Sequence, residues 1–197
     1  RHEAAEALGA IGAPNVAEIL QKYLKDPVVE VAETCELALE RIKWLQDPNR
    51  ATEKLSENPY SSVDPAPPAT VSDISALQEI LMNDHASLFD RYRAMFALRN
   101  MRTKDAVVAL GSALKSGSAL FRHEIAFVLG QLQDEASVPF LSESLEDCTE
   151  NEMVRHECAE ALGAIASEDC FKVLNKYLGD DKRVVKESCE IALDMCE

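Results

Sequence analysis

The sequence lacks the features of a membrane or exported protein. Its apolar runs reach only about five residues, whereas a membrane-spanning helix needs about 20. It has no initiator methionine, no basic leader and no apolar leader core, because Arg1-His2-Glu3 opens directly into an amphipathic pattern. We therefore expect a fragment of a longer chain that begins partway into a helix, and no membrane as a partner.

Basic residues are scarce as well. Lys and Arg number 20 against 35 Asp and Glu, which gives a net charge of −15. Such a surface repels phosphate backbones and attracts cations, so we expect no nucleic acid as a partner and favour a basic protein or a polyamine-like group. The six cysteines form no C-x-x-C pair and mostly fall in helical patterns, which indicates reduced thiols and a cytoplasmic location.

No stretch alternates apolar and polar residues for long enough to predict a strand. The chain instead repeats itself, because the eleven residues from Arg1 to Ile11 return from Arg155 to Ile165 with one difference. Aligned copies place the position of His2 again at 33, 92, 123, 156 and 187, in steps of 31, 59, 31, 33 and 31 residues.

Each repeat holds two helical patterns, such as 137–146 followed by 151–165. We therefore predict an all-α fold, an α-solenoid of twelve helices in six antiparallel pairs, similar in period to HEAT repeats. Asn151 and Asp181 occupy expected helix N-caps. Gly9, Gly130 and Gly163 are costly inside helices and predict close approach to the next repeat.

The long step of 59 residues divides the chain. Residues 46–72 carry five of the eight prolines and are predicted to be a linker. It separates two repeats (1–45) from four repeats (73–197), and the short part matches the last two repeats of the long part. This match predicts two pseudo-symmetric halves. We therefore expect two further repeats before Arg1.

Three of the four histidines share one motif. His2, His123 and His156 are each preceded by Arg and followed by Glu, always in the same phase of the repeat. One interpretation is that duplication copied these surface residues without a function. However, three repeats lack the pair and keep the apolar core, so packing does not require it.

The alternative interpretation is a metal site. Adjacent helical positions differ by about 100°, so His and Glu of one motif can both face a single cavity. Mixed imidazole and carboxylate ligands favour iron or manganese, and motifs from two facing halves would form a dinuclear centre. The zinc-protease motif H-E-x-x-H is absent, as is the E-x-x-H of ferritin-like proteins.

Together with these motifs, two segments make the resemblance specific. They are Ser62-Val-Asp-Pro-Ala-Pro-Pro68 and Phe89-Asp-Arg-Tyr-Arg-Ala-Met-Phe-Ala-Leu-Arg99. Over essentially its whole length the chain resembles the deoxyhypusine hydroxylase family. The resemblance implies an iron-dependent monooxygenase that uses dioxygen and two iron ions to hydroxylate deoxyhypusine on translation initiation factor 5A, completing hypusine synthesis.

The resemblance also implies residue roles. It makes His2, His123 and His156 iron ligands and Glu124 a carboxylate ligand, with each iron drawing histidines from one half and a Glu from the other. Glu3 and Glu157 resemble the carboxylates nearest the substrate amine, although binding to iron is the alternative for both. The family has four motifs and this chain three, so we expect the chain alone to be metal-poor and inactive.

Other residues carry weaker expectations. Met153 lies one turn before His156 and is a candidate for contact with the substrate's alkyl chain, with core packing as the alternative. Tyr60 and His85 are expected at the surface. Uncovered apolar residues such as Leu8, Ile11 and Ile19 predict self-association. Two other functions stay open, namely a non-enzymatic repeat scaffold and a protein similar to the phycobilin lyases.

Overall fold

In the computed structural model, which describes residues 1–195, the chain contains eleven α-helices and four short 3-10 helices, and no strand occurs in that range. The chain forms two compact units, Arg1–Asn100 and Met101–Glu197. The all-helical prediction is confirmed.

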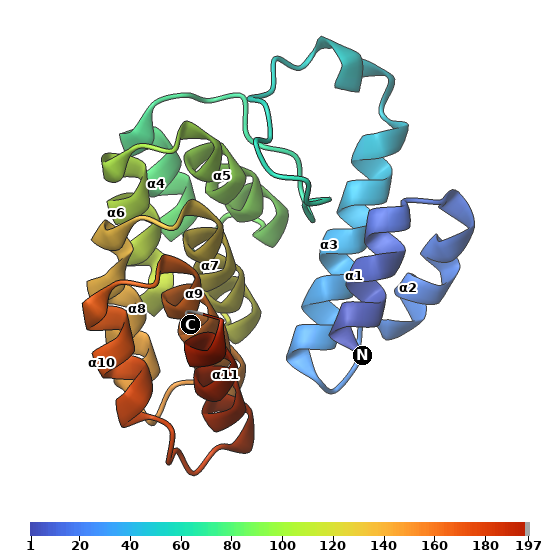
Figure 1. The fold of residues 1–197 in the computed structure, drawn as a ribbon. Coiled ribbons are helices and arrows are strands. Elements are labelled where there is room, and N and C mark those ends of the chain that lie inside the picture. Colours follow the sequence, from blue (N-terminus) through green and yellow to red (C-terminus); the bar gives the residue numbers. More distant parts are fainter. Residues whose placement is uncertain (196–197) are drawn as a thin grey trace. The chain divides into compact units, whose positions relative to one another are not determined.

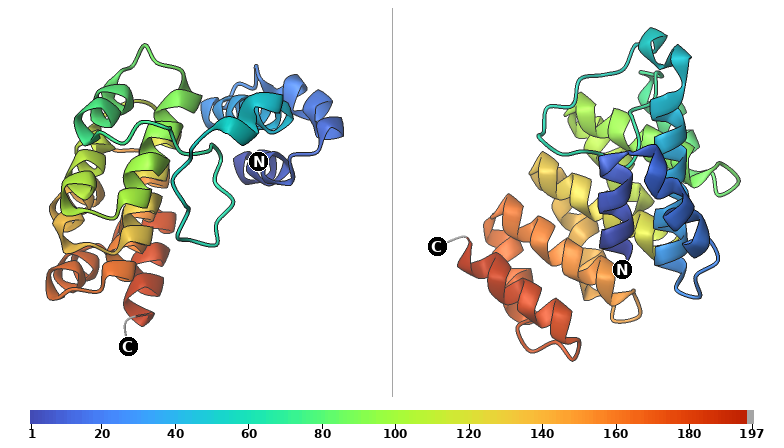
Figure 2. Two further views of the ribbon diagram at one scale, coloured as in Figure 1. Left: turned by 90° about the horizontal axis from the view of Figure 1, so that it is seen from above. Right: turned by 90° about the vertical axis from the view of Figure 1, so that its right-hand side faces the viewer.

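The second unit is a short solenoid (Figure 1). Its helices form three antiparallel hairpins, which are α6 (Lys104–Ser112) with α7 (Ala119–Leu132), α8 (Val138–Glu146) with α9 (Glu152–Ile165), and α10 (Glu168–Lys176) with α11 (Arg183–Asp194). Of two 3-10 turns, η3 (Ala113–Lys115) lies between α6 and α7, and η4 (Glu135–Ser137) joins the first hairpin to the second. Figure 2 shows α6, α8 and α10 as one layer and α7, α9 and α11 as the other.

The first unit contains five α-helices and two 3-10 turns. These are α1 (His2–Ile11), η1 (Pro14–Val16), α2 (Ala17–Tyr23), α3 (Val29–Gln46), η2 (Pro48–Thr52), α4 (Ile74–Met82) and α5 (Leu88–Met101), whose last residue falls in the second unit. Helix α3 packs against both α1 and α2 around a small core that includes Ala5, Leu20 and Cys35.

The expected total of twelve helices is wrong. His2 occupies the second-helix phase of its repeat, and α1 starts at that residue, so α1 has no preceding partner within the chain. The described residues therefore form five hairpins and one additional helix.

The glycine prediction is confirmed. A Cβ added at Gly163 would lie 2.6 Å from the Cβ of Ala192, and one at Gly9 would lie 2.7 Å from the Cβ of Ala38. At Gly130 the corresponding distance to the backbone of the next repeat is 3.2 Å. The absent side chains let α1, α7 and α9 approach the second helix of the following repeat.

Helix ends match the sequence in part. Asn151 caps α9 by accepting a hydrogen bond from the backbone N–H of Met153, as expected. Asp181 is not a cap, because α11 starts one residue later than expected and Lys182 occupies its N-cap position. Helix α9 ends at Ile165, and its C-cap Ala166 has a left-handed backbone (φ 58°), which glycine adopts at lower cost.

After Gln46, the last residue of α3, the proline-rich segment 46–72 contains only η2 as regular structure, yet it is packed. Asp64 receives two hydrogen bonds from the buried Arg99, at 2.8 and 2.6 Å, and its carbonyl accepts one from Arg41. Ala69 donates its N–H to the carbonyl of Arg93 at 2.8 Å, and Ala66 is only 1% exposed. The segment therefore fixes the end of α5 within the first unit.

Four described cysteines, Cys35, Cys158, Cys170 and Cys189, are buried in helices as small apolar residues, as expected, whereas Cys148 is exposed and Cys196 lies outside the described residues. Burial raises the pKa of Cys189 to about 11. Within residues 1–195, no helix combines the length and apolarity needed to cross a membrane.

An apolar groove of about 220 Å³ lies over α1 and α2, lined by residues that include Leu8 and Ile19. Ile11 and Ile19 are 69% and 45% exposed, as expected for an uncovered face, while Leu8 is half-buried. Self-association through this groove stays a prediction.

Candidate metal centre

Two of the three His-Glu motifs meet in the second unit. His123 lies on α7, and His156 and Glu157 lie on α9, which packs directly against α7. The Nε2 atom of His123 lies 3.2 Å from an Oε2 of Glu157, and the two imidazole centroids are 5.5 Å apart. One potential ligand atom from each residue lies within 4.8 Å of the other two.

The chemistry of these donors fits a non-haem iron ion. Two imidazoles and one carboxylate are the ligand set of mononuclear iron oxygenase sites, which leaves further coordination positions open. Glu157 is 8% exposed and the side chain of His123 is 15% exposed, so the group is largely removed from water. A structural zinc site would favour thiolates, and the group contains none.

Glu157 is therefore the carboxylate that the structure brings to the two imidazoles. Glu124 follows His123 on α7 and is also buried, at 7% exposure. Among residues 1–195, the grouped donors are His123, His156 and Glu157, without Glu124. The role of Glu124 as an iron ligand stays a prediction.

The third motif belongs to the first unit. His2 and Glu3 lie at the start of α1, with His2 Nε2 3.1 Å from Glu3 Oε1. The side chain of Glu3 is largely exposed and that of His2 is largely covered. A part for His2 and Glu3 in a second iron site stays a prediction.

The arginine of each motif, to which the sequence analysis gave no role, joins its repeat to the next one. Each pairs with an acidic residue that lies beyond the first helix of the following repeat. The pairs are Arg1–Asp26, Arg122–Glu150 and Arg155–Asp180. The arginine thus holds its helix against the following repeat, while His and Glu remain available for the site.

Sequence reasoning also missed Glu160. This residue lies one turn after His156 on α9, and its Oε1 is 3.4 Å from His156 Nδ1. Ser188 on α11 donates a hydrogen bond to the same oxygen at 3.3 Å. The hydrogen bond from His156 lowers the pKa of Glu160. The available signal was the His-x-x-x-Glu spacing, which places both side chains on one helical face.

A cavity of about 370 Å³ adjoins these residues between α7, α9 and α11. Glu157 and Glu160 lie among its lining residues with the apolar side chains of Phe127, Ile191 and Met195. The cavity offers apolar walls beside two carboxylates. Met153 is half-buried on α9, one turn before Glu157, and its contact with substrate stays a prediction.

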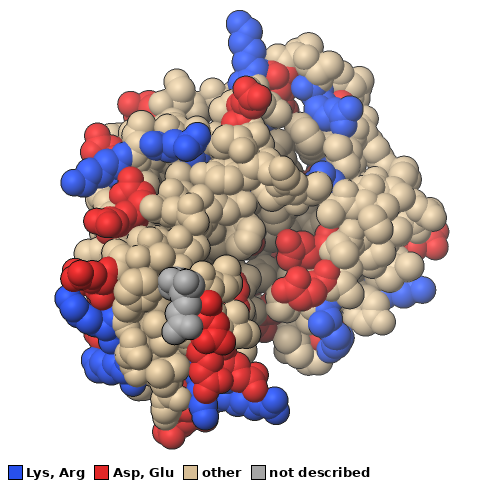
Figure 3. Space-filling view, viewed as in Figure 1, with Lys and Arg blue, Asp and Glu red and all other residues tan. Residues whose placement is uncertain are grey.

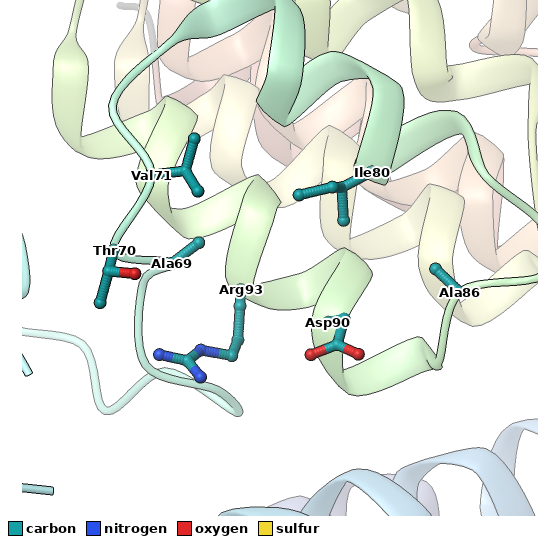
Figure 4. Close-up of a pocket in the computed structure, with 7 residues that line it drawn as sticks. All are labelled: Ala69, Thr70, Val71, Ile80, Ala86, Asp90 and Arg93. Atoms are coloured by element: carbon teal, nitrogen blue, oxygen red, sulfur yellow. The ribbon is translucent and has the colours of Figure 1, made fainter.

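The first repeat of the long half has no such site. At the phase of His-Glu it carries Tyr92-Arg93, and Arg93 lines a separate cavity of about 280 Å³ in the first unit. Figure 4 shows Arg93 and Asp90 on α5 beside the loop of Ala69 to Val71. His85 is exposed as expected, whereas Tyr60 is partly buried and its ring lies under the guanidinium of Arg99.

The repeat geometry defines the class of protein. Residues 74–150 and 108–194 match the family model described as HEAT repeats, and residues 1–26 match the one described as PBS lyase HEAT-like repeat. The chain is a HEAT-repeat protein.

Individual relatives define the family more closely. The whole chain is 64% identical to the deoxyhypusine hydroxylase of Drosophila melanogaster and 58% identical to that of Homo sapiens, covering 65% and 64% of their lengths. The solved structure of human deoxyhypusine hydroxylase in complex with glycerol matches with a TM-score of 0.94 at 58% identity, over all of this chain and 67% of that one. The chain belongs to the deoxyhypusine hydroxylase family and spans about two thirds of the length of these relatives.

Proposed function

We propose that the protein of which this chain is a part hydroxylates the deoxyhypusine side chain of translation initiation factor 5A, using dioxygen and iron. The observation that carries this proposal is the His123–His156–Glu157 group, because its donor set is that of non-haem iron oxygenases. Family membership supports the substrate class, since the relatives are named deoxyhypusine hydroxylase.

His123, His156 and Glu157 would hold one iron ion in the second unit. Iron bound there, supplied with two electrons by an external reductant, would supply the redox chemistry that transfers one oxygen atom of dioxygen to carbon and releases the other as water. His2 and Glu3 would serve a second ion together with a further motif from outside this chain. One ion at each of these two groups of ligands gives two iron ions per complete site.

The chain's own residues would also bind and orient the substrate. Deoxyhypusine carries a long side chain with amines, and the net charge of −15 favours the approach of a cationic partner. Figure 3 shows acidic side chains gathered over α11, which carries Glu187, Glu190 and Asp194. Glu3 and Glu157 are the candidates for pairing with the amine, with binding to iron as their alternative, Met153 is the candidate for contact with the alkyl chain, and Glu124 is a candidate iron ligand. The proposed location is the cytoplasm.

Metal analysis tests this function. The chain, and a version extended to the length of its relatives, would be loaded with ferrous iron without oxygen and then assayed for hydroxylation of deoxyhypusine. His123→Ala and His156→Ala should release iron with little loss of helix, because each imidazole supplies a metal bond and lies outside the apolar core.

Matched controls exist in repeats without histidine. Glu33 and Glu187 occupy the phase of the motif histidines, so Glu33→Gln and Glu187→Gln should leave iron content unchanged. Full iron retention by both histidine variants would refute the proposal and favour a non-enzymatic scaffold. Binding of a bilin without iron would favour the phycobilin lyase alternative.

A further inference from the structure

The imidazole of His156 lies beside a carboxylate of its own helix. Its Nδ1 is 3.4 Å from Glu160 Oε1, and the same ring belongs to the group with His123 and Glu157. Glu160 is itself held from the neighbouring repeat, since Ser188 on α11 donates to it at 3.3 Å. Ser188 is 4% exposed, so its hydroxyl is directed into the interface between α9 and α11.

The sequence repeats this arrangement in the other half. His2 is followed four residues later by Glu6, as His156 is followed by Glu160. One repeat further on, the hydroxyl residues Thr34 and Ser188 hold the same phase, although the Thr34 hydroxyl donates to the backbone carbonyl of Glu30. The motif of His123 differs, because Phe127 stands at the position of Glu160. The carboxylate and hydroxyl therefore accompany the last His-Glu motif of each half.

We propose that Glu160, held by Ser188, is a positioning residue that fixes His156 as its Nδ1–H tautomer and presents an unprotonated Nε2 to the metal. An ionised carboxylate only accepts hydrogen bonds, so a neutral imidazole beside it carries its proton on Nδ1. Carboxylates in this position hold the ring orientation of metal-binding histidines and increase their basicity. The proposal rests on the proposed function in that His156 is a metal ligand.

Nuclear magnetic resonance of the ¹⁵N-histidine-labelled 197-residue chain tests the tautomer directly. Measured without metal and at alkaline pH, with His156→Ala to assign the signals, the parent should show His156 protonated at Nδ1. Glu160→Ala should give a mixture of tautomers. Ser188→Ala should shift the same equilibrium by a smaller amount, because Glu160 keeps its place on α9.

Titration with Co²⁺ of the chain extended to the length of its relatives gives a second readout, because the 197-residue chain alone is expected to be metal-poor. Loss of such a partner commonly weakens metal binding about 10–100-fold, and we expect this for Glu160→Ala. Glu152→Ala is the control on the same helix, where Glu152 is exposed and pairs with Lys182. Ser144→Ala controls for loss of a buried hydroxyl, since Ser144 is 0% exposed on α8. Both controls should bind Co²⁺ as the parent does.

The two readouts separate this proposal from the proposed function. A parent with His156 protonated at Nε2, or a Glu160→Ala variant with the parent's tautomer and Co²⁺ affinity, overturns the role of Glu160. If the extended parent binds no Co²⁺, or binds it equally without His156, the metal function fails, and the tautomer measurement still decides whether Glu160 orients the imidazole.

Discussion

Asp180→Asn should destabilise the protein, because it removes the charge that faces a buried arginine. Arg155 is 2% exposed and donates to Asp180 from Nη1 at 3.2 Å and from Nη2 at 2.5 Å. Its Nε donates to the carbonyl of Leu145 at 2.9 Å, so the guanidinium is held in place and cannot turn to solvent. The variant leaves a buried positive charge without its counter-ion.

The size of the destabilisation depends on the hydrogen bond to Arg155 that asparagine can still accept. Removing one partner of a buried ion pair costs about 3–5 kcal/mol. The asparagine side chain retains one oxygen that can accept from Arg155, and a hydrogen bond to a charged group contributes about 1.5–3 kcal/mol. The expected loss in the free energy of unfolding is therefore about 1.5–2 kcal/mol.

The effect depends on pH in a defined direction. The hydrogen bonds from Arg155, and then from the backbone N–H of Lys182, lower the pKa of Asp180 below its ordinary value of 3.8. A carboxylate whose pKa is lower in the folded state stabilises fully above its unfolded pKa and loses this contribution as the pH falls through the folded value. The gap between parent and variant should be widest at neutral pH and close in acid.

Urea unfolding followed by far-ultraviolet circular dichroism, at neutral pH and at about pH 3, measures both effects. Asp169→Asn is the control, because Asp169 forms only an exposed ion pair with Lys172. This variant should unfold at the same urea midpoint as the parent. An Asp180→Asn variant with the parent's stability at neutral pH, or a gap that widens in acid, would refute the reasoning.

Three further predictions concern packing, backbone and thiols. Gly163→Ala should lower the free energy of unfolding by about 1–2 kcal/mol, because overpacking against the Cβ of Ala192, which the backbone fixes in place, outweighs the gain in helix propensity. In the control Gly179→Ala, the added Cβ has no neighbour within 4 Å, so this variant should match the parent in the same urea assay. Ala166→Gly should raise the thermal midpoint, with a gain of about 0.5–1 kcal/mol from relief of the left-handed backbone. Among the described cysteines, Cys148 alone should react with a maleimide under native conditions, as mass spectrometry would show, and rapid labelling of the buried thiols would contradict the packing.

The repeat pattern was enough to predict the fold in its main features. The period gave the hairpins, as for 137–146 and 151–165, which the structure shows as α8 and α9 with shifts of one residue at their starts. The glycines predicted close contacts because only a missing side chain explains their place inside helices. The packing of segment 46–72 was not predictable, because the pairing of Asp64 with Arg99 joins residues 35 positions apart in the sequence.

The candidate site was predicted in part. Spacing alone placed His123 and His156 in one phase, and the structure brings them together with Glu157. Spacing could not separate the roles of Glu124 and Glu157, since both follow a histidine directly. The choice depends on which side chain reaches across from one helix to the next, and that is a property of the packing between α7 and α9.

The ion pairs formed by the motif arginines determine where this solenoid can be divided without separating a charged residue from its partner. Arg122 reaches Glu150 and Arg155 reaches Asp180, so each pair spans the boundary between successive hairpins. A hairpin transplanted alone would carry its arginine away from the acid that neutralises it. Exchange of repeats between relatives should therefore preserve the interval from each arginine to its acidic partner, because a chimaera that loses the acidic partner has an unpaired charge next to the His-Glu motif.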